Sequence, residues 1–139
     1  MIFILYTADY EIFFGENYYS ERDVLIEPTN GLLETCENIG IPITLFCDVA
    51  CLWRYKELGL NKFPEEAELQ LKSAIKRGHD VQAHIHPHWL KATKNSNVWD
   101  WDLKNYLLGN TSDEECYNSS IFFIKQAADY LSELLKPIE

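Results

Sequence analysis

Basic residues are scarce in this sequence. Its 139 residues include 12 lysines and arginines against 22 aspartates and glutamates, which gives a formal net charge of −10 at pH 7. Proteins that bind nucleic acid or an anionic membrane surface need a basic patch opposite the phosphate groups. The charge balance therefore disfavours both kinds of partner, whereas a small metal site remains compatible with it.

Long apolar runs and cysteine pairs are also missing. No stretch reaches the ~18 consecutive apolar residues that predict a transmembrane helix. Residues 1–5 are apolar, but they have no basic flank and no cleavage site, so we do not expect a signal peptide. The four cysteines include no C-x-x-C pair; they are Cys36, Cys47, Cys51 and Cys116. Without an export signal, we expect reduced thiols in a cytoplasmic protein.

Histidine is absent from most of the chain and concentrated in one place. All four histidines lie in residues 78–89, which read Gly-His-Asp-Val-Gln-Ala-His-Ile-His-Pro-His-Trp. Histidine is the commonest metal ligand and the side chain best suited to proton transfer near neutral pH. This concentration is the first indication of a functional site.

The local pattern predicts how these histidines are presented. Gly78 is a natural residue to end a helix, and residues 79–85 then alternate as a strand does, with Val81, Ala83 and Ile85 on one face. Pro87 interrupts the strand because it cannot donate a backbone hydrogen bond.

Two geometries remain open after this strand. A continued extended chain would place His84, His86 and His88 on one polar face, whereas a helical turn would pair only His84 with His88. Both geometries bring His84 and His88 together, so these two are the expected metal ligands and His86 is an accessory candidate. Solvated imidazoles at a polar strand end are the competing interpretation.

Two acidic residues follow a second strand. Residues 2–7 are short, β-rich and apolar, which predicts a buried strand. Asp9 and Glu11 come directly after it, two residues apart, so an extended backbone points both to the same side. Carboxylates at the end of an interior strand lie where open α/β sheets and α/β barrels keep their active sites.

The remaining pattern predicts a single α/β domain over residues 1–139. Helices are expected at residues 22–38, 50–58, 64–77 and 112–135, with a further buried strand at 41–47. Strands that alternate with helices favour a parallel sheet. Residues 90–110 are expected to be irregular, and their Trp99 and Trp101 either pack in the interior or stack on sugar rings.

Two of these motifs together resemble the polysaccharide deacetylase family (the NodB-homology domain). The first is Thr-Ala-Asp-Tyr-Glu at residues 7–11, and the second is Gly-His-Asp-Val-Gln-Ala-His-Ile-His-Pro-His at residues 78–88. The order of the motifs and their positions at strand ends carry the resemblance. It covers nearly the whole chain but only the N-terminal part of the family's domain, which is an irregular (β/α) barrel.

The resemblance implies a metal-dependent hydrolase that removes acetyl groups from an N-acetylated sugar. By this resemblance, Asp9 is the catalytic base, and Glu11, His84 and His88 hold a divalent transition metal, with Zn²⁺ expected. The family's usual Asp-Asp pair is interrupted by Tyr10, so Glu11 corresponds to the ligand of divergent D-x-E members.

Other residues have accessory roles under the same resemblance. His86 and Trp89 are accessory candidates beside the metal, and Trp99 and Trp101 are candidates for contact with the carbohydrate substrate.

The sequence also departs from the family. The family places an arginine that orients the base, and an acid that protonates the leaving amine, on later strands. No arginine follows Arg77 here and no histidine follows His88. We therefore expect an incomplete barrel that is a poor catalyst by itself, with an open sheet edge that favours a homo-oligomer.

Two other functions stay open at this point. One is a catalytically silent metal- or sugar-binding module, which keeps the ligands but lacks the later catalytic motifs. The other is an α/β protein of flavodoxin-like size that binds no metal and has a histidine-rich loop.

Overall fold

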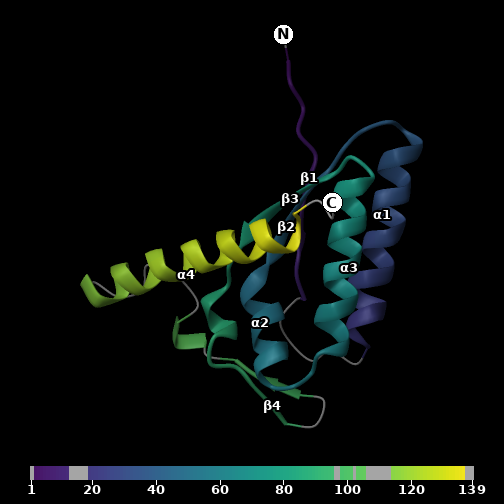
Figure 1. Ribbon diagram of the computed structural model, residues 1–139. Helices are drawn as coiled ribbons and strands as arrows, with labels where there is room; N and C mark the ends of the chain where they lie inside the picture. The colour runs from purple at the N-terminus through teal and green to yellow at the C-terminus, as the bar shows by residue number, and fades with distance from the viewer. Residues whose placement is uncertain (1, 13–18, 96–97, 102, 106–113, 137–139) are drawn as a thin grey trace.

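A three-stranded parallel sheet lies at the centre of the computed structural model, which describes residues 2–12, 19–95, 98–101, 103–105 and 114–136. The strands are β1 (Thr7–Tyr10), β2 (Thr44–Asp48) and β3 (Asp80–His84), in the order β1-β2-β3 (Figure 1). The expected alternation of parallel strands with helices is confirmed. Within the described residues these three strands form an open sheet.

The helices lie between and after the strands. They are a π-helical turn η1 (Arg22–Ile26), α1 (Glu27–Asn38), α2 (Val49–Glu57), α3 (Lys62–Lys76) and α4 (Glu114–Leu134). Both crossovers step in the same direction across the sheet, so the right-handed rule places α1 and α3 on the same face. Figure 1 shows these two helices side by side. The predicted first residue of α4, Ser112, lies outside the described residues.

The end of α3 directs the chain into the histidine-bearing strand. Gly78 has a φ of 91°, a conformation that glycine adopts without strain. Its N–H donates to the Ile75 carbonyl, and the N–H of His79 donates to the Ala74 carbonyl, each over 3.0 Å. These bonds satisfy carbonyl groups at the helix end. The prediction that Gly78 ends this helix is confirmed.

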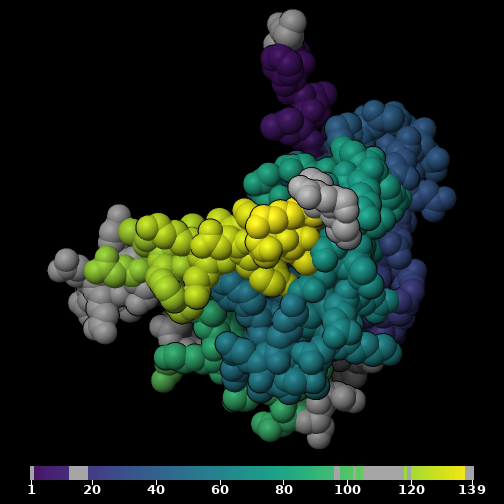
Figure 2. Space-filling view, viewed as in Figure 1, coloured from purple at the N-terminus to yellow at the C-terminus, as the bar shows by residue number. Residues whose placement is uncertain are grey.

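The first strand differs from its prediction. Residues 2–7 were expected to be a buried strand, but β1 begins at Thr7, and the side chains of Ile2, Phe3, Ile4 and Leu5 are exposed. β1 begins later than predicted because β2 begins at Thr44, the register partner of Thr7. Residues 2–5 therefore have no residues of β2 beside them to pair with. We call residues 2–6 the apolar arm; it projects from the body of the molecule (Figure 2).

The two faces of the sheet have opposite character. Alternate side chains face α1 and α3 and are buried; they are Tyr10, Leu45, Cys47 and Val81. The side chains between them face the other way and are exposed or half-buried; they are Thr7, Asp9, Thr44, Phe46, Asp80 and Gln82. Parallel sheets are normally covered on both faces, so this open face is unusual. Ala83 was expected beside Val81 on the buried face, but it is exposed because β3 is an edge strand.

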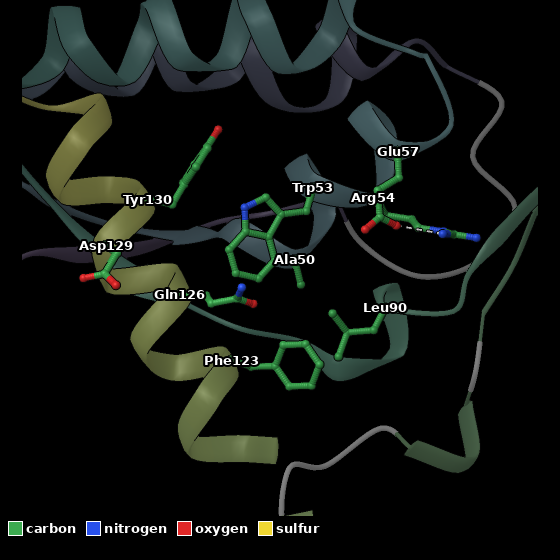
Figure 3. Close-up of a pocket in the computed structure, with 9 residues that line it drawn as sticks. All are labelled: Ala50, Trp53, Arg54, Glu57, Leu90, Phe123, Gln126, Asp129 and Tyr130. Carbon is green, nitrogen blue, oxygen red and sulfur yellow. Dashed lines mark hydrogen bonds and ion pairs between the residues drawn. The ribbon is translucent and has the colours of Figure 1, made fainter. Parts of the chain in front are cut away.

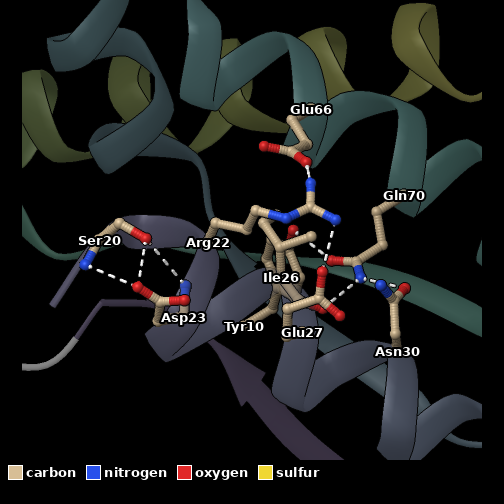
Figure 4. Close-up of polar contacts among 9 residues, drawn as sticks. All are labelled: Tyr10, Ser20, Arg22, Asp23, Ile26, Glu27, Asn30, Glu66 and Gln70. Atoms are coloured by element: carbon tan, nitrogen blue, oxygen red, sulfur yellow. Dashed lines mark hydrogen bonds and ion pairs between the residues drawn. The ribbon is translucent and has the colours of Figure 1, made fainter.

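A buried hydrogen-bond network ties β1 to the helix layer (Figure 4). The Tyr10 hydroxyl donates to Oε1 of Gln70 over 2.8 Å. The amide nitrogen of Gln70 donates to the Ile26 carbonyl over 2.8 Å and to Oδ1 of Asn30 over 2.7 Å. Because buried polar groups are costly without partners, this network fixes the position of Tyr10 and of the chain that follows it. On the surface beside this network, Arg22 forms ion pairs with Glu27 and Glu66.

The segment after β3 is more regular than predicted. A 3₁₀ turn η2 (Pro87–Trp89) is followed by an antiparallel hairpin of β4 (Thr93–Asn95) and β5 (Val98–Asp100), and then by a second 3₁₀ turn η3 (Leu103–Asn105). The expectation of an irregular loop over residues 90–110 is therefore wrong for this part. No helix among the described residues is long and apolar enough to cross a membrane.

Candidate metal centre

Three side chains from three strands meet at the carboxyl end of the sheet. In the register, Tyr10 pairs with Cys47 and Asp48 pairs with His84. The next residue after Tyr10 is Glu11, so Glu11, Asp48 and His84 form one row across the three strand ends. By strand alternation this row belongs to the open face. The sheet therefore aligns two carboxylates and one imidazole.

His86, two residues after the end of β3, also contacts this row. It is extended, with φ −108° and ψ 109°, and directly precedes η2. Its Nε2 lies 2.7 Å from Oε2 of Glu11 and 2.9 Å from Nε2 of His84. The same oxygen of Glu11 lies 3.4 Å from Nε2 of His84. The potential ligand atoms of Glu11, His84 and His86 thus all lie within 4.8 Å of one another.

This donor set fits a divalent transition metal. The in-plane site of an imidazole nitrogen holds either one proton or one lone pair, so a single N–H on His86 Nε2 cannot point along both of its short contacts. A cation between Glu11 Oε2, His84 Nε2 and His86 Nε2 would accept a lone pair from each of these three atoms. Zn²⁺ bonds of 2.0–2.2 Å imply that ligands in a tetrahedron stand roughly 3.3 Å apart. The observed separation of 3.4 Å matches that value, whereas the separations of 2.7 and 2.9 Å are shorter, so these atoms would move apart slightly around a bound ion.

Asp48, the last residue of β2, is a carboxylate that was not among the predicted site residues. Its side chain is 1% exposed, and its Oδ1 accepts the backbone N–H of His86 over 3.3 Å. Its Oδ2 is buried without a hydrogen-bond partner. Burial, together with the charge of Glu11, raises the pKa of Asp48 to about 7, although the backbone N–H groups of His86 and Cys51 act in the opposite direction.

His88 is placed differently from the other two candidate histidines. It lies inside η2 and is 2% exposed. Its ring is 5.1 Å from that of His86, between centroids, and 5.5 Å from that of Trp89. Burial lowers the pKa of His88 to about 4, with a contribution from His86, so its imidazole is neutral at neutral pH. Within the described part of the chain, His84 meets His86 rather than His88 because the 3₁₀ turn at Pro87 redirects the chain.

The remaining predicted site residues are spread around this centre. Asp9 is exposed on the open face of β1, two residues before Glu11. Trp89 is fully buried. Trp99 lies 4.8 Å from Tyr55 and 4.9 Å from Trp89, between ring centroids, and Trp101 lies 5.9 Å from Trp89. The structure thus places the three tryptophans in one aromatic cluster with Tyr55, which is the packing alternative.

The fourth histidine belongs to the opposite end of the sheet. Nδ1 of His79 accepts the backbone N–H of Ile43 over 3.3 Å, which puts the ring proton on Nε2, 3.2 Å from Oε1 of Glu37. His79 therefore joins the start of β2 to α1 and takes no part in the metal centre.

A cavity of about 500 Å³ opens between α2 and α4 (Figure 3). Its lining combines aromatic side chains with polar ones; it consists of Ala50, Trp53, Arg54, Glu57, Leu90, Phe123, Gln126, Asp129 and Tyr130. Trp53 and Tyr130 meet edge to face, with ring centroids 6.1 Å apart. Ala50, in the first turn of α2, is the lining residue nearest in sequence to Asp48, and none of the candidate metal ligands lines the cavity.

Comparisons with protein-family models, with curated proteins and with solved structures give no match for this chain.

Proposed function

We propose that this chain is the metal-binding part of a metal-dependent hydrolase that resembles the carbohydrate deacetylases. The observation that supports the proposal is the convergence of Glu11 Oε2, His84 Nε2 and His86 Nε2 within 3.4 Å at the carboxyl end of a parallel sheet. Open α/β sheets place their ligand sites at this edge. The deacetylase resemblance rests on residues 7–11 and 78–88, and it supplies the substrate class.

The three side chains would hold the metal as two imidazoles and one carboxylate. Three protein ligands are typical of catalytic sites, because a fourth position stays open for water or substrate. A divalent metal at such a site lowers the pKa of bound water and polarises a carbonyl oxygen. The choice of His86 over His88 as the second imidazole follows the distances in the structure, whereas the family resemblance favours His88.

The neighbouring acids have separate tasks in this proposal. Asp48 positions His86, because its Oδ1 accepts the His86 backbone N–H. Asp9 is the proton acceptor, since its exposed carboxylate lies on the same open face as Glu11 and can reach a substrate that approaches there. A neutral amide at this position could not accept a proton, so Asp9→Asn should retain the metal and abolish turnover.

Metal content measured on protein purified without an affinity tag tests the proposal. Wild type should carry about one equivalent of zinc, and Glu11→Ala, His84→Ala and His86→Ala should each lose it. His79→Ala is the matched control, because it removes a histidine from the same stretch at the other end of β3, and it should keep the metal. Equal zinc in wild type and in the three ligand variants would refute the site.

His88→Ala decides between the two imidazole assignments. If this variant keeps zinc while His86→Ala loses it, the structural assignment holds; the reverse result would return His88 to the ligand set. Acetate release from an N-acetylated chito-oligosaccharide then tests the activity itself. Zinc binding without acetate release would favour a silent binding module.

A further inference from the structure

The cavity between α2 and α4 is bounded by one face of each helix (Figure 3). Its lining residues on α2 are at positions 50, 53, 54 and 57, and those on α4 are at positions 123, 126, 129 and 130. Residues three or four positions apart lie on the same side of a helix. The volume of about 500 Å³ is within the range of pockets that hold small organic molecules.

The side chains of this cavity change in character from the inside to the outside. Ala50 is fully buried, and the aromatic rings are half-buried; they are those of Trp53, Phe123 and Tyr130. Three polar side chains of the lining are exposed; they are Glu57, Gln126 and Asp129. Aromatic walls with a few polar groups are the usual make-up of a ligand pocket. The cavity therefore has the composition of a binding site.

The charges of the lining favour a positively charged ligand. Arg54 is already engaged, because its Nη1 donates to Oε2 of Glu57 over 2.8 Å and its Nε donates to the Ala92 carbonyl. Asp129 has no ion-pair or hydrogen-bond partner among the residues that the structure describes. An anion would have to compete with Glu57 for Arg54 and would be repelled by Asp129. A cation would instead meet a carboxylate that nothing else neutralises.

The aromatic rings are arranged to receive such a charge. The rings of Trp53 and Tyr130 form two walls nearly at right angles, with an interplanar angle of 76° and centroids 6.1 Å apart. The Tyr130 ring already holds an ammonium group, since Nζ of Lys56 lies 5.3 Å from its centroid and is paired with Glu68. Tryptophan attracts cations more strongly than tyrosine. No lysine or arginine of the described residues lies over the Trp53 ring.

We propose that this cavity binds a small organic ammonium ion, with its alkyl groups against the Trp53 ring and its positive charge balanced by Asp129. Aromatic rings recognise quaternary ammonium groups in this way. The net charge of −10 also attracts cations at long range. A neutral sugar would use the same aromatic faces but would leave the charge of Asp129 unbalanced. This inference is independent of the proposed function.

A titration of the ¹⁵N-labelled chain with choline, followed by NMR, tests the proposal. Choline should bind with a Kd of ~1 mM, as expected for so small a ligand. It should shift the indole N–H signal of Trp53, which is identified by its absence from Trp53→Leu. The matched ligand is 3,3-dimethyl-1-butanol, which has the shape of choline without its charge and should bind at least about fivefold more weakly. Equal affinities for the two would overturn the proposal, as would no shift of this signal at ~50 mM choline.

Two variants of α4 test the role of the charge. Asp129→Asn should weaken choline binding about threefold, the effect of losing one exposed ionic contact. Glu133→Gln is the matched control, because it removes a 75% exposed carboxylate from the same helix outside the cavity, and it should bind choline as wild type does. Equal weakening in both variants would assign the effect to the overall charge and overturn the site.

Trp53→Leu tests the aromatic wall and should weaken choline binding about fivefold. If this variant does not fold, Asp129→Asn still decides, because its exposed side chain has no partner to lose. N-acetylglucosamine is titrated in parallel against wild type. Tighter binding of N-acetylglucosamine than of choline would show a saccharide site and would also overturn the proposal.

Discussion

The two ends of the parallel sheet depart from the usual distribution of side chains in opposite directions. At the carboxyl end, polar groups are withdrawn from water: Asp48 is 1% exposed, and Glu11 is half-buried against two imidazoles. At the amino end, the apolar arm stands in water. Buried polar groups and exposed apolar patches are the informative exceptions in a fold. These two ends are therefore where binding is expected, and the carboxyl end is the one whose side chains could hold a cation.

The middle of the sheet shows what an ordinary arrangement looks like in the same molecule. Leu45, Cys47 and Val81 face the helix layer and are buried. Their burial supplies the usual apolar contribution of about 1.5–3 kcal/mol for a large side chain. We therefore expect binding at the ends of the sheet and stability from its centre, and the following variants test that division from the largest expected effect to the smallest.

We expect zinc to stabilise the folded protein by binding at the carboxyl end of the parallel sheet and nowhere else. At a zinc concentration of 100 times Kd, a ligand that binds only the folded state adds about 2.7 kcal/mol. Thermal unfolding should therefore shift upward by several degrees with zinc and return with a chelator. His84→Ala should abolish the shift and Ile4→Ser should leave it intact. A zinc-dependent shift that persists in His84→Ala would place the metal elsewhere.

Gln70→Leu should cost roughly 1–3 kcal/mol, because it leaves the Tyr10 hydroxyl and the Ile26 carbonyl buried without their partner. Urea denaturation measures the loss. Gln82→Leu is the matched control: Gln82 is exposed on the open face, and the change there should stay within ~0.5 kcal/mol. Similar losses at the two positions would mean that the open face is covered in solution.

His79→Ala should cost about 1–2 kcal/mol, since it removes the acceptor of the Ile43 N–H at the start of β2. Arg77→Gln, which removes only the exposed ion pair with Glu37, should cost less than ~1 kcal/mol. Urea denaturation of both variants in parallel gives the comparison. If Arg77→Gln proved the more damaging, the surface ion pair would be what anchors α1 at this end.

Ile4→Ser should have the smallest effect on the stability of the monomer, within ~0.5 kcal/mol, because its side chain is exposed in both the folded and the unfolded chain. Urea denaturation at ~0.5 µM protein makes the measurement. A loss of more than ~1 kcal/mol would show that the arm packs against its own chain.

The sequence predicted the order of elements better than their boundaries. Glycine ended α3 as expected, and the alternation of apolar strands with helices gave the parallel sheet. The run at residues 2–6 has no alternation of apolar and polar side chains, so it carries no period that could set its pairing with β2. The hairpin of β4 and β5 escaped detection because three-residue strands are too short to show alternation.

The candidate metal centre was predicted in part. The family resemblance named Glu11 as a ligand, and His84 was named because both geometries considered for the histidine stretch brought it beside another histidine. The meeting of parallel strand ends at one edge would have placed Asp48 between them, but a single carboxylate has no motif to single it out. The contact of His86 with His84 depended on the 3₁₀ turn at Pro87, which the pattern left open against a helical turn.

The separation of the parallel strands along the sequence also affects when the sheet can form during translation. Thr7 pairs with Thr44, and Thr44 pairs with Asp80, so each strand must wait for a partner synthesised about 36 residues later. At ~5–20 residues per second, the ribosome needs roughly 2–7 s for each such interval. During the first interval β1 has already been translated without the strand that it pairs with. The sheet can therefore form only late in synthesis, after β3 has left the ribosome.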